Sequence, residues 1–253
     1  MCPLTRRKHP EEPETKSEEL KRDRGRMVVF SSIIIVLLIA AIAVMVYRDQ
    51  QRNAVKPVNR QATHRTAQTD TTKINYAIQP ILGSTNAPVK IAEFADYRCP
   101  YCKTFEETVV PRLQQDYINT NKASFSFINY TILGPESLLA AEASEEVYHQ
   151  NPKGFWAFHK ALYQEQGSES KPWVTEKLLT DTARKTVPSL DVKAFQNALT
   201  TQSHKQAIAA DNELGEDLGV PGTPAIFVNG KYIKNGQDYK VLKKAIDQAL
   251  KNP

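Results

Sequence analysis

Two cysteines separated by two residues are the clearest chemical signal in this chain of 253 residues. Cys99 and Cys102 enclose Pro100 and Tyr101, and the chain has one further cysteine, Cys2. This spacing lets the two sulfur atoms bond to each other, and it also supplies two of the four ligands in many zinc sites. The chemistry open to the pair is therefore thiol–disulfide exchange, metal binding or a purely structural crosslink.

A strand and a helix are predicted to position the pair. Residues 89–95 (VKIAEFA) have the pattern of a strand, and a helix is predicted to begin at the cysteines. Because the N-terminus of a helix stabilises a thiolate, Cys99 is the predicted attacking sulfur, and Cys102 lies one turn deeper as the resolving thiol. Pro100 suits the first helical turn, where its missing N–H costs nothing.

The other two uses of the cysteines are less favoured. A zinc site would need ligands from isolated histidines, and His149, His159 and His204 lack the paired spacing of such ligands. A structural disulfide across so short a loop would remove little entropy from the unfolded chain. Redox exchange is therefore the preferred interpretation of the pair.

The first half of the remaining pattern alternates between strand and helix. Residues 124–131 (SFSFINYT) are predicted to form a second strand, and Pro111 should kink or restart the preceding helix. From 134 to 222 the apolar spacing is helical, and Asp191 or Ser189 is expected to cap one of these helices. Aromatic residues in this stretch are assigned to helix packing rather than to a substrate groove.

The last part of the chain predicts a hairpin and a final helix. Residues 224–230 form the first strand, and 231–233 form its partner across a two-residue turn at Asn229-Gly230. An amphipathic helix closes the chain, with its apolar side chains at Val241, Leu242, Ile246 and Leu250. The whole order predicts an α/β fold with a helical subdomain inserted over about 135–218.

Two further positions stand out near the cysteine pair in this scheme. Glu93 is an acid within the first predicted strand, where it either faces solvent or is buried among apolar neighbours. Pro224 directly precedes a strand, which is an ordinary place for proline, and Thr223 comes before it.

Together these motifs resemble the thioredoxin superfamily, and within it the DsbA-like branch. The resemblance lies in EFADYRCPYCKTFE at 93–106, LGPES at 133–137 and GVPGTPAIFVNG at 219–230, and it covers about 88–250. It is strongest toward the membrane-anchored DsbA-like proteins of Gram-positive bacteria. One departure is the Pro-Tyr dipeptide between the cysteines, which is usual in glutaredoxins and leaves the oxidising strength open.

The resemblance implies a thioredoxin-like fold and several residue roles. Pro224 would be a cis-proline facing the cysteines, and the main chain of Thr223 would bind an extended substrate. Glu93 would be a buried acid with a raised pKa that shuttles protons for Cys102. The resemblance also implies a quinone-linked integral-membrane partner that reoxidises the cysteine pair. Sulfur exchange needs no metal or organic cofactor.

The chain is predicted to contain four segments: a disordered cytoplasmic tail (1–26), a transmembrane anchor (27–47), a flexible linker (48–74) and a DsbA-like domain (75–253). The anchor has 21 uncharged residues, about 31 Å as a helix, which matches a bilayer core. A cleaved signal peptide is the alternative, because Ala41-Ile42-Ala43 has the pattern of a cleavage site. The basic residues flanking the span weakly favour a cytoplasmic N-terminus.

The predicted function is that of a single-pass membrane protein whose extracytoplasmic domain donates its disulfide to reduced exported proteins. The net charge of +5 is mild, and the absence of a basic block interleaved with aromatics argues against nucleic-acid binding. A monomer is expected. A reductase or isomerase using the same cysteines is the main alternative, and a tethered peptide-binding or chaperone module is a weaker one.

Overall fold

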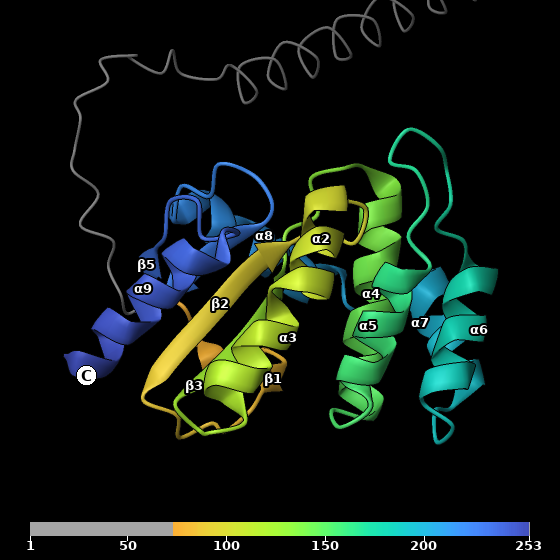
Figure 1. Ribbon diagram of the computed structural model, residues 1–253. Coiled ribbons are helices and arrows are strands. Elements are labelled where there is room, and N and C mark those ends of the chain that lie inside the picture. Colours follow the sequence, from red (N-terminus) through yellow and green to blue (C-terminus); the bar gives the residue numbers. More distant parts are fainter. Residues whose placement is uncertain (1–72, 253) are drawn as a thin grey trace, which may run out of the picture. The chain divides into compact units, whose positions relative to one another are not determined.

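A computed structural model describes residues 73–252 of the chain. Within this range the strands form one sheet in the order β1-β3-β2-β4-β5 (Figure 1). The strands are β1 (Ile81–Leu82), β2 (Val89–Ala95), β3 (Ala123–Asn129), β4 (Ala225–Val228) and β5 (Lys231–Tyr232). No helix in this range is long and apolar enough to cross a membrane. The predicted tail, anchor and nearly all of the predicted linker lie outside the described residues.

The central strand, β2, leads directly to the cysteine pair. It pairs in parallel with β3 and antiparallel with β4, so that Glu93 lies between Phe127 and Ile226. Side chains of a strand alternate between faces, and here Val89 and Ile91 pack on the opposite side from Ala92 and Phe94. All but one residue of β2 is buried, which explains its apolar run.

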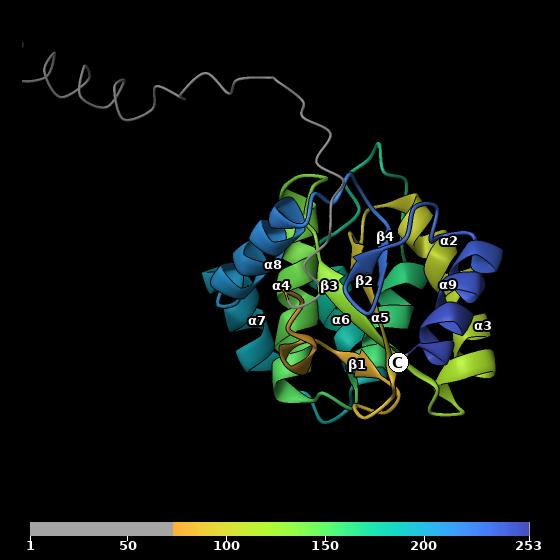
Figure 2. The ribbon, with the colours of Figure 1, turned by 90° about the vertical axis from the view of Figure 1, so that its left-hand side faces the viewer.

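Helices cover both faces of the sheet, as Figure 2 shows with α8 on one side and α2, α3 and α9 on the other. The covering helices are α2 (Pro100–Thr108), α3 (Val110–Leu113), α8 (Lys205–Asp217) and α9 (Tyr239–Lys251). The break between α2 and α3 precedes Pro111, as the sequence predicts, because proline cannot donate the helical hydrogen bond. The predicted closing helix corresponds to α9.

A helical insertion separates β3 from β4, which confirms the expected subdomain. It consists of α4 (Pro135–Gln150), α5 (Phe155–Gln164), α6 (Glu176–Thr186), α7 (Val192–Thr201) and α8. Asp191 caps α7, since its carboxylate accepts the N–H groups of Lys193 and Ala194. The hairpin is also confirmed: Asn229 and Gly230 both have positive φ, as a type I′ turn requires.

Short elements near the start of the domain and after α3 are not predicted by the sequence pattern. They are η1 (Tyr76–Ile78), β1 and the π-helical turn η2 (Gln114–Ile118). Each is too short to show a period of its own. Ile74, assigned by the sequence to the end of the linker, is buried in an apolar cluster with Phe94, so the packed domain starts before residue 75.

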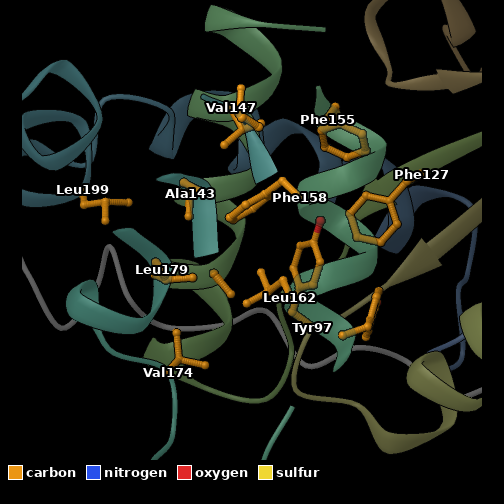
Figure 3. Packing of buried hydrophobic residues seen from close by; sticks show 14 of the residues in the cluster. Tyr97, Phe127, Ala143, Val147, Phe155, Phe158, Leu162, Val174, Leu179 and Leu199 are labelled. Atoms are coloured by element: carbon orange, nitrogen blue, oxygen red, sulfur yellow. The ribbon is translucent and has the colours of Figure 1, made fainter. Parts of the chain in front are cut away.

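One apolar cluster joins the insertion to the site. It contains Phe155 and Phe158 of α5 together with Cys99, Cys102 and other buried residues. Figure 3 shows Phe158 among side chains of α4, α5 and α6. Both phenylalanines are fully buried, so they pack the helices and do not line a groove, as predicted.

Candidate active site

The cysteine pair lies where β2 ends and α2 begins. Cys99 is the N-cap residue of α2 and Pro100 occupies its first turn. The Cys99 N–H donates to the Asp96 carbonyl at 3.0 Å, and the Cys99 carbonyl accepts the N–H groups of Cys102 and Lys103 at 3.1 and 3.2 Å. The predicted strand–motif–helix arrangement is therefore present, with Cys99 at the positive end of the helix.

Both cysteines are free thiols, and their pKa values are shifted in opposite directions. The pKa of Cys99 is lowered to about 6, first by a hydrogen bond from Cys102, against the effect of burial, and further by Thr223 and the backbone N–H groups of Cys102 and Tyr101. Burial raises the pKa of the Cys102 thiol well above its usual range. Cys99 is 5% exposed and Cys102 is 0% exposed. Of the two thiols, Cys99 has the lower pKa and the larger exposed fraction, and is therefore the one better suited to act as a nucleophile.

The loop before β4 faces Cys99. The Thr223–Pro224 peptide bond is cis, and the Cys99 Sγ donates to the Thr223 carbonyl at 3.3 Å. Antiparallel pairing of β4 with β2 sets Ala225 opposite Phe94 and so delivers this loop to the end of β2. Residues 124 positions apart in the sequence are brought together here.

Glu93 is buried beneath the pair, and the alternative of a solvent-facing glutamate is wrong. Its side chain is 1% exposed, and its Oε1 atom has no hydrogen-bond partner within residues 73–252. Burial raises the pKa of this carboxyl well above its usual range, and the charges of Glu106 and Cys99 add to the effect. A carboxyl group in this state can hold a proton at neutral pH.

Asp96 organises the loop in a way that the sequence analysis missed. Its carboxylate accepts the N–H of Arg98 at 2.8 Å and those of Ile132 and Leu133 at 2.9 and 3.1 Å. These bonds tie the segment before Cys99 to the segment after β3. An Asp two residues before Arg98 is compatible with many turns, so its long-range partners could not be read from the sequence.

The helical insertion also reaches the active-site backbone. The Gln166 side-chain amide donates to the carbonyls of Tyr97 and Cys99 at 2.6 and 3.1 Å. Arg98 donates to the carbonyls of Leu133 and Glu169, both at 2.6 Å. No sequence signal distinguishes Gln166 from an ordinary polar loop residue, and sequence analysis missed it for that reason.

Two of the histidines considered as zinc ligands have other partners. His159 lies between Tyr97 and Glu106. His204 contacts Glu146, with 2.6 Å between its Nε2 and the carboxylate Oε2. Both rings therefore have hydroxyl or carboxyl partners within the described residues.

A sulfur that ionises near pH 6, beside a thiol that stays protonated, can form and release a disulfide. On this fold, that chemistry is the chemistry of the thiol–disulfide oxidoreductases. Comparison with known proteins agrees. The family model described as thioredoxin matches residues 77–248.

Similar proteins define the branch. The probable disulfide bond formation protein D of Bacillus anthracis is 39% identical over 176 residues, which cover 70% of this chain and 80% of the relative. Oxidised BdbD from Bacillus subtilis aligns with a TM-score of 0.66 and 39% identity, covering 68% of this chain and 93% of that one. The thiol-disulfide exchange protein alpha-DsbA2 from Wolbachia pipientis aligns with a TM-score of 0.59 and 27% identity, covering 70% of this chain and 89% of that one. The chain belongs to the thioredoxin superfamily, in its DsbA-like branch, and is a thiol–disulfide oxidoreductase.

The acidity of Cys99 gives a direct prediction. In reduced Cys2→Ala protein, the ultraviolet absorbance of the thiolate should rise with a midpoint at pH about 6, and alkylation by iodoacetamide should slow below it. Adding Cys99→Ala should remove this step, because burial keeps Cys102 protonated in the same range. A step that survives in Cys99→Ala, or one near the ordinary thiol value, would contradict the assignment.

Proposed function

We propose that this protein donates the Cys99–Cys102 disulfide to reduced exported proteins outside the cytoplasm. The main support for this proposal is the low pKa of Cys99 beside the raised pKa of Cys102. A stabilised thiolate favours the reduced pair, and a pair that favours reduction is an oxidant toward its substrates. The relatives named disulfide bond formation protein D support this direction.

The reaction proceeds by two exchanges. A substrate thiolate attacks Cys99 Sγ, the bond between the two cysteines breaks, and Cys102 leaves as a thiolate. Buried Glu93 gives its proton to Cys102, which burial disfavours as an anion. A second substrate thiolate then attacks the substrate sulfur of the mixed disulfide, and Cys99 leaves. Its low pKa makes it a good leaving group. The substrate loses two electrons and the enzyme gains them.

The membrane anchoring, the substrate binding and the reoxidising partner are proposed from the sequence and the resemblance. The span at 27–47 would anchor the chain, with its N-terminus in the cytoplasm and its catalytic domain outside. The Thr223 main chain, which faces Cys99, is suited to bind an extended substrate segment by backbone hydrogen bonds. A quinone-linked integral-membrane protein would reoxidise the pair, and the enzyme would act as a monomer without a metal or organic cofactor.

The reduction potential tests the direction of the reaction. Full-length Cys2→Ala protein, in which only the active pair titrates, is equilibrated with glutathione mixtures and the two redox forms are separated after alkylation. We expect a potential closer to about −120 mV, the value of a strong oxidant, than to about −270 mV, the value of thioredoxin. A value near that of thioredoxin would overturn disulfide donation and favour a reductase.

A second measurement in the same preparation tests the substrate step. The oxidised protein should restore activity to a reduced, unfolded test protein whose native fold requires disulfides. The reduced fold gains stability from the Cys99 thiolate, and this gain is lost as the pH falls through about 6. Oxidation of the test protein should therefore weaken at acidic pH, where substrate thiols also protonate.

A further inference from the structure

We propose that Gln166 is a positioning residue for Cys99: its side-chain amide holds the loop between β2 and α2, so that the first turn of α2 keeps its N–H groups at the Cys99 sulfur. Gln166 lies in the connection between α5 and α6, 67 residues from Cys99 along the chain. This role goes beyond the proposed disulfide donation, because it applies whether the protein forms or breaks the disulfides of its substrates.

The Gln166 amide bridges two carbonyl groups of the active-site loop. Its Nε2 atom donates to the Tyr97 carbonyl at 2.6 Å and to the Cys99 carbonyl at 3.1 Å. A side-chain amide has two N–H donors, so one group can serve both carbonyls. For Tyr97 it is the one donor to the carbonyl among residues 73–252. A single side chain thus fixes the peptide units on both sides of Arg98.

The orientation of these peptide units bears on the Cys99 thiolate. The backbone N–H groups of Tyr101 and Cys102, in the first turn of α2, lower the pKa of Cys99. Cys99 is the N-cap residue of that helix, and its carbonyl accepts the N–H groups of Cys102 and Lys103. A rotation of the Cys99 carbonyl would therefore move the first turn away from the sulfur and raise the pKa of the thiol.

Gln166 is itself held in place at the end of α5. Its backbone N–H donates to the Tyr163 carbonyl at 3.2 Å. The same carbonyl accepts the Lys103 ammonium group of α2 at 2.5 Å. Lys103 directly follows Cys102, so α5 is tied to the cysteine-bearing helix one residue past the motif. The Gln166 amide therefore extends from a fixed backbone.

Arg98 anchors the rest of the connection between α5 and α6. Its guanidinium donates to the Glu169 carbonyl at 2.6 Å, and its Nε atom lies 3.3 Å from Glu136 Oε2. The Glu136 carboxylate accepts the backbone N–H groups of Trp173 and Val174 at 3.3 and 3.4 Å. Figure 1 shows this connection rising at the end of the molecule where α2 begins. The segment that carries Gln166 is thus tied to the active-site loop along its length.

The helical insertion reaches the cysteine motif through this amide. In the part of the chain that the structure describes, Gln166 is the residue of the insertion whose side chain is hydrogen-bonded to the segment from Cys99 to Cys102. The other side-chain or loop partner of Cys99 is Thr223, which follows the insertion. Gln166 is therefore the point at which the packing of the insertion can set the reactivity of the sulfur.

Gln166→Met in the full-length Cys2→Ala protein tests this role. Methionine keeps the length of the side chain but cannot donate to either carbonyl. We expect the thiolate midpoint of Cys99, followed by ultraviolet absorbance, to move upward. The equilibrium with glutathione should shift by roughly three- to tenfold toward the oxidised enzyme, the effect of one hydrogen bond, which is about 15–30 mV. The sign follows because a less stable thiolate disfavours the reduced pair.

Gln164→Met is the matched control. Gln164 is the last residue of α5, it is exposed, and it makes no hydrogen bond to the active-site loop among the described residues. It should keep the parent midpoint and the parent equilibrium. Amide hydrogen exchange adds a readout that does not depend on titration: the N–H groups of Cys102 and Lys103 should exchange faster in Gln166→Met, because the Cys99 carbonyl that accepts them is less firmly held.

A folded Gln166→Met with the parent midpoint and the parent glutathione equilibrium would overturn the role. A lower free energy of unfolding in urea with both values unchanged would overturn it too, since Gln166 would then only support the fold. These readouts are differences between variants, so they can fail while the absolute potential still supports disulfide donation.

Gln166→Glu takes the place of the methionine variant if that variant does not fold. A carboxylate has the same length and polarity as the amide but cannot donate to the two carbonyls. Gln164→Glu controls for the added negative charge. A larger shift toward the oxidised enzyme in Gln166→Glu than in Gln164→Glu supports the proposal, and equal shifts would contradict it.

Discussion

Replacing Cys99 with alanine should abolish disulfide transfer to a reduced test protein, down to the rate of the buffer alone. Cys102 cannot take over, because it is 0% exposed and burial keeps it protonated. The measurement is the recovery of activity by the reduced test protein, with Cys2→Ala as the control that keeps full activity. Activity that survives in Cys99→Ala would favour a peptide-binding module whose disulfide does not react.

The companion variant, Cys102→Ala, should accumulate a mixed disulfide. The Cys99 thiolate attacks a disulfide of the substrate or of the reoxidising partner, and no neighbouring thiol displaces it. Because the Cys102 thiol is the largest cause of the low pKa of Cys99, the trapping reaction is best run at alkaline pH. The trapped species should disappear on reduction and should be absent from the Cys99→Ala, Cys102→Ala double variant.

Replacing Phe158 with alanine should lower the free energy of unfolding by about 3–5 kcal/mol, through lost apolar burial and the cavity left behind. Phe158 is 0% exposed and belongs to the same cluster as Cys99, Cys102 and Tyr97 (Figure 3). The loss is therefore expected to loosen the active-site loop as well as the insertion. Urea unfolding of the reduced and the oxidised protein measures it.

Ile78→Ala provides the control for this stability change. Ile78 is 64% exposed, so its truncation removes little buried surface and should change stability by no more than about 0.5 kcal/mol. A loss below about 1 kcal/mol in Phe158→Ala would contradict the packing of α5 described above. An equal loss in both variants would indicate a general effect of truncation rather than the core.

Local pattern was enough to locate most elements of this domain. Alternation along residues 89–95 predicts β2, Pro111 predicts the break after α2, and Asn229-Gly230 predicts the hairpin turn. Each of these signals acts over a few residues, through side-chain period, a missing N–H or a tolerated positive φ. The short elements η1, β1 and η2 carry no such signal and were missed.

By itself the sequence determined the cysteine pair, its strand–helix setting and the resemblance to a family, because these depend on residue type at short spacing. Only the tertiary structure decided that Glu93 is buried, that Gln166 binds the carbonyls of the active-site loop, and that His159 contacts Glu106. Burial and pKa depend on what distant segments place around a group. In this protein, one sheet and an insertion packed against it supply those surroundings.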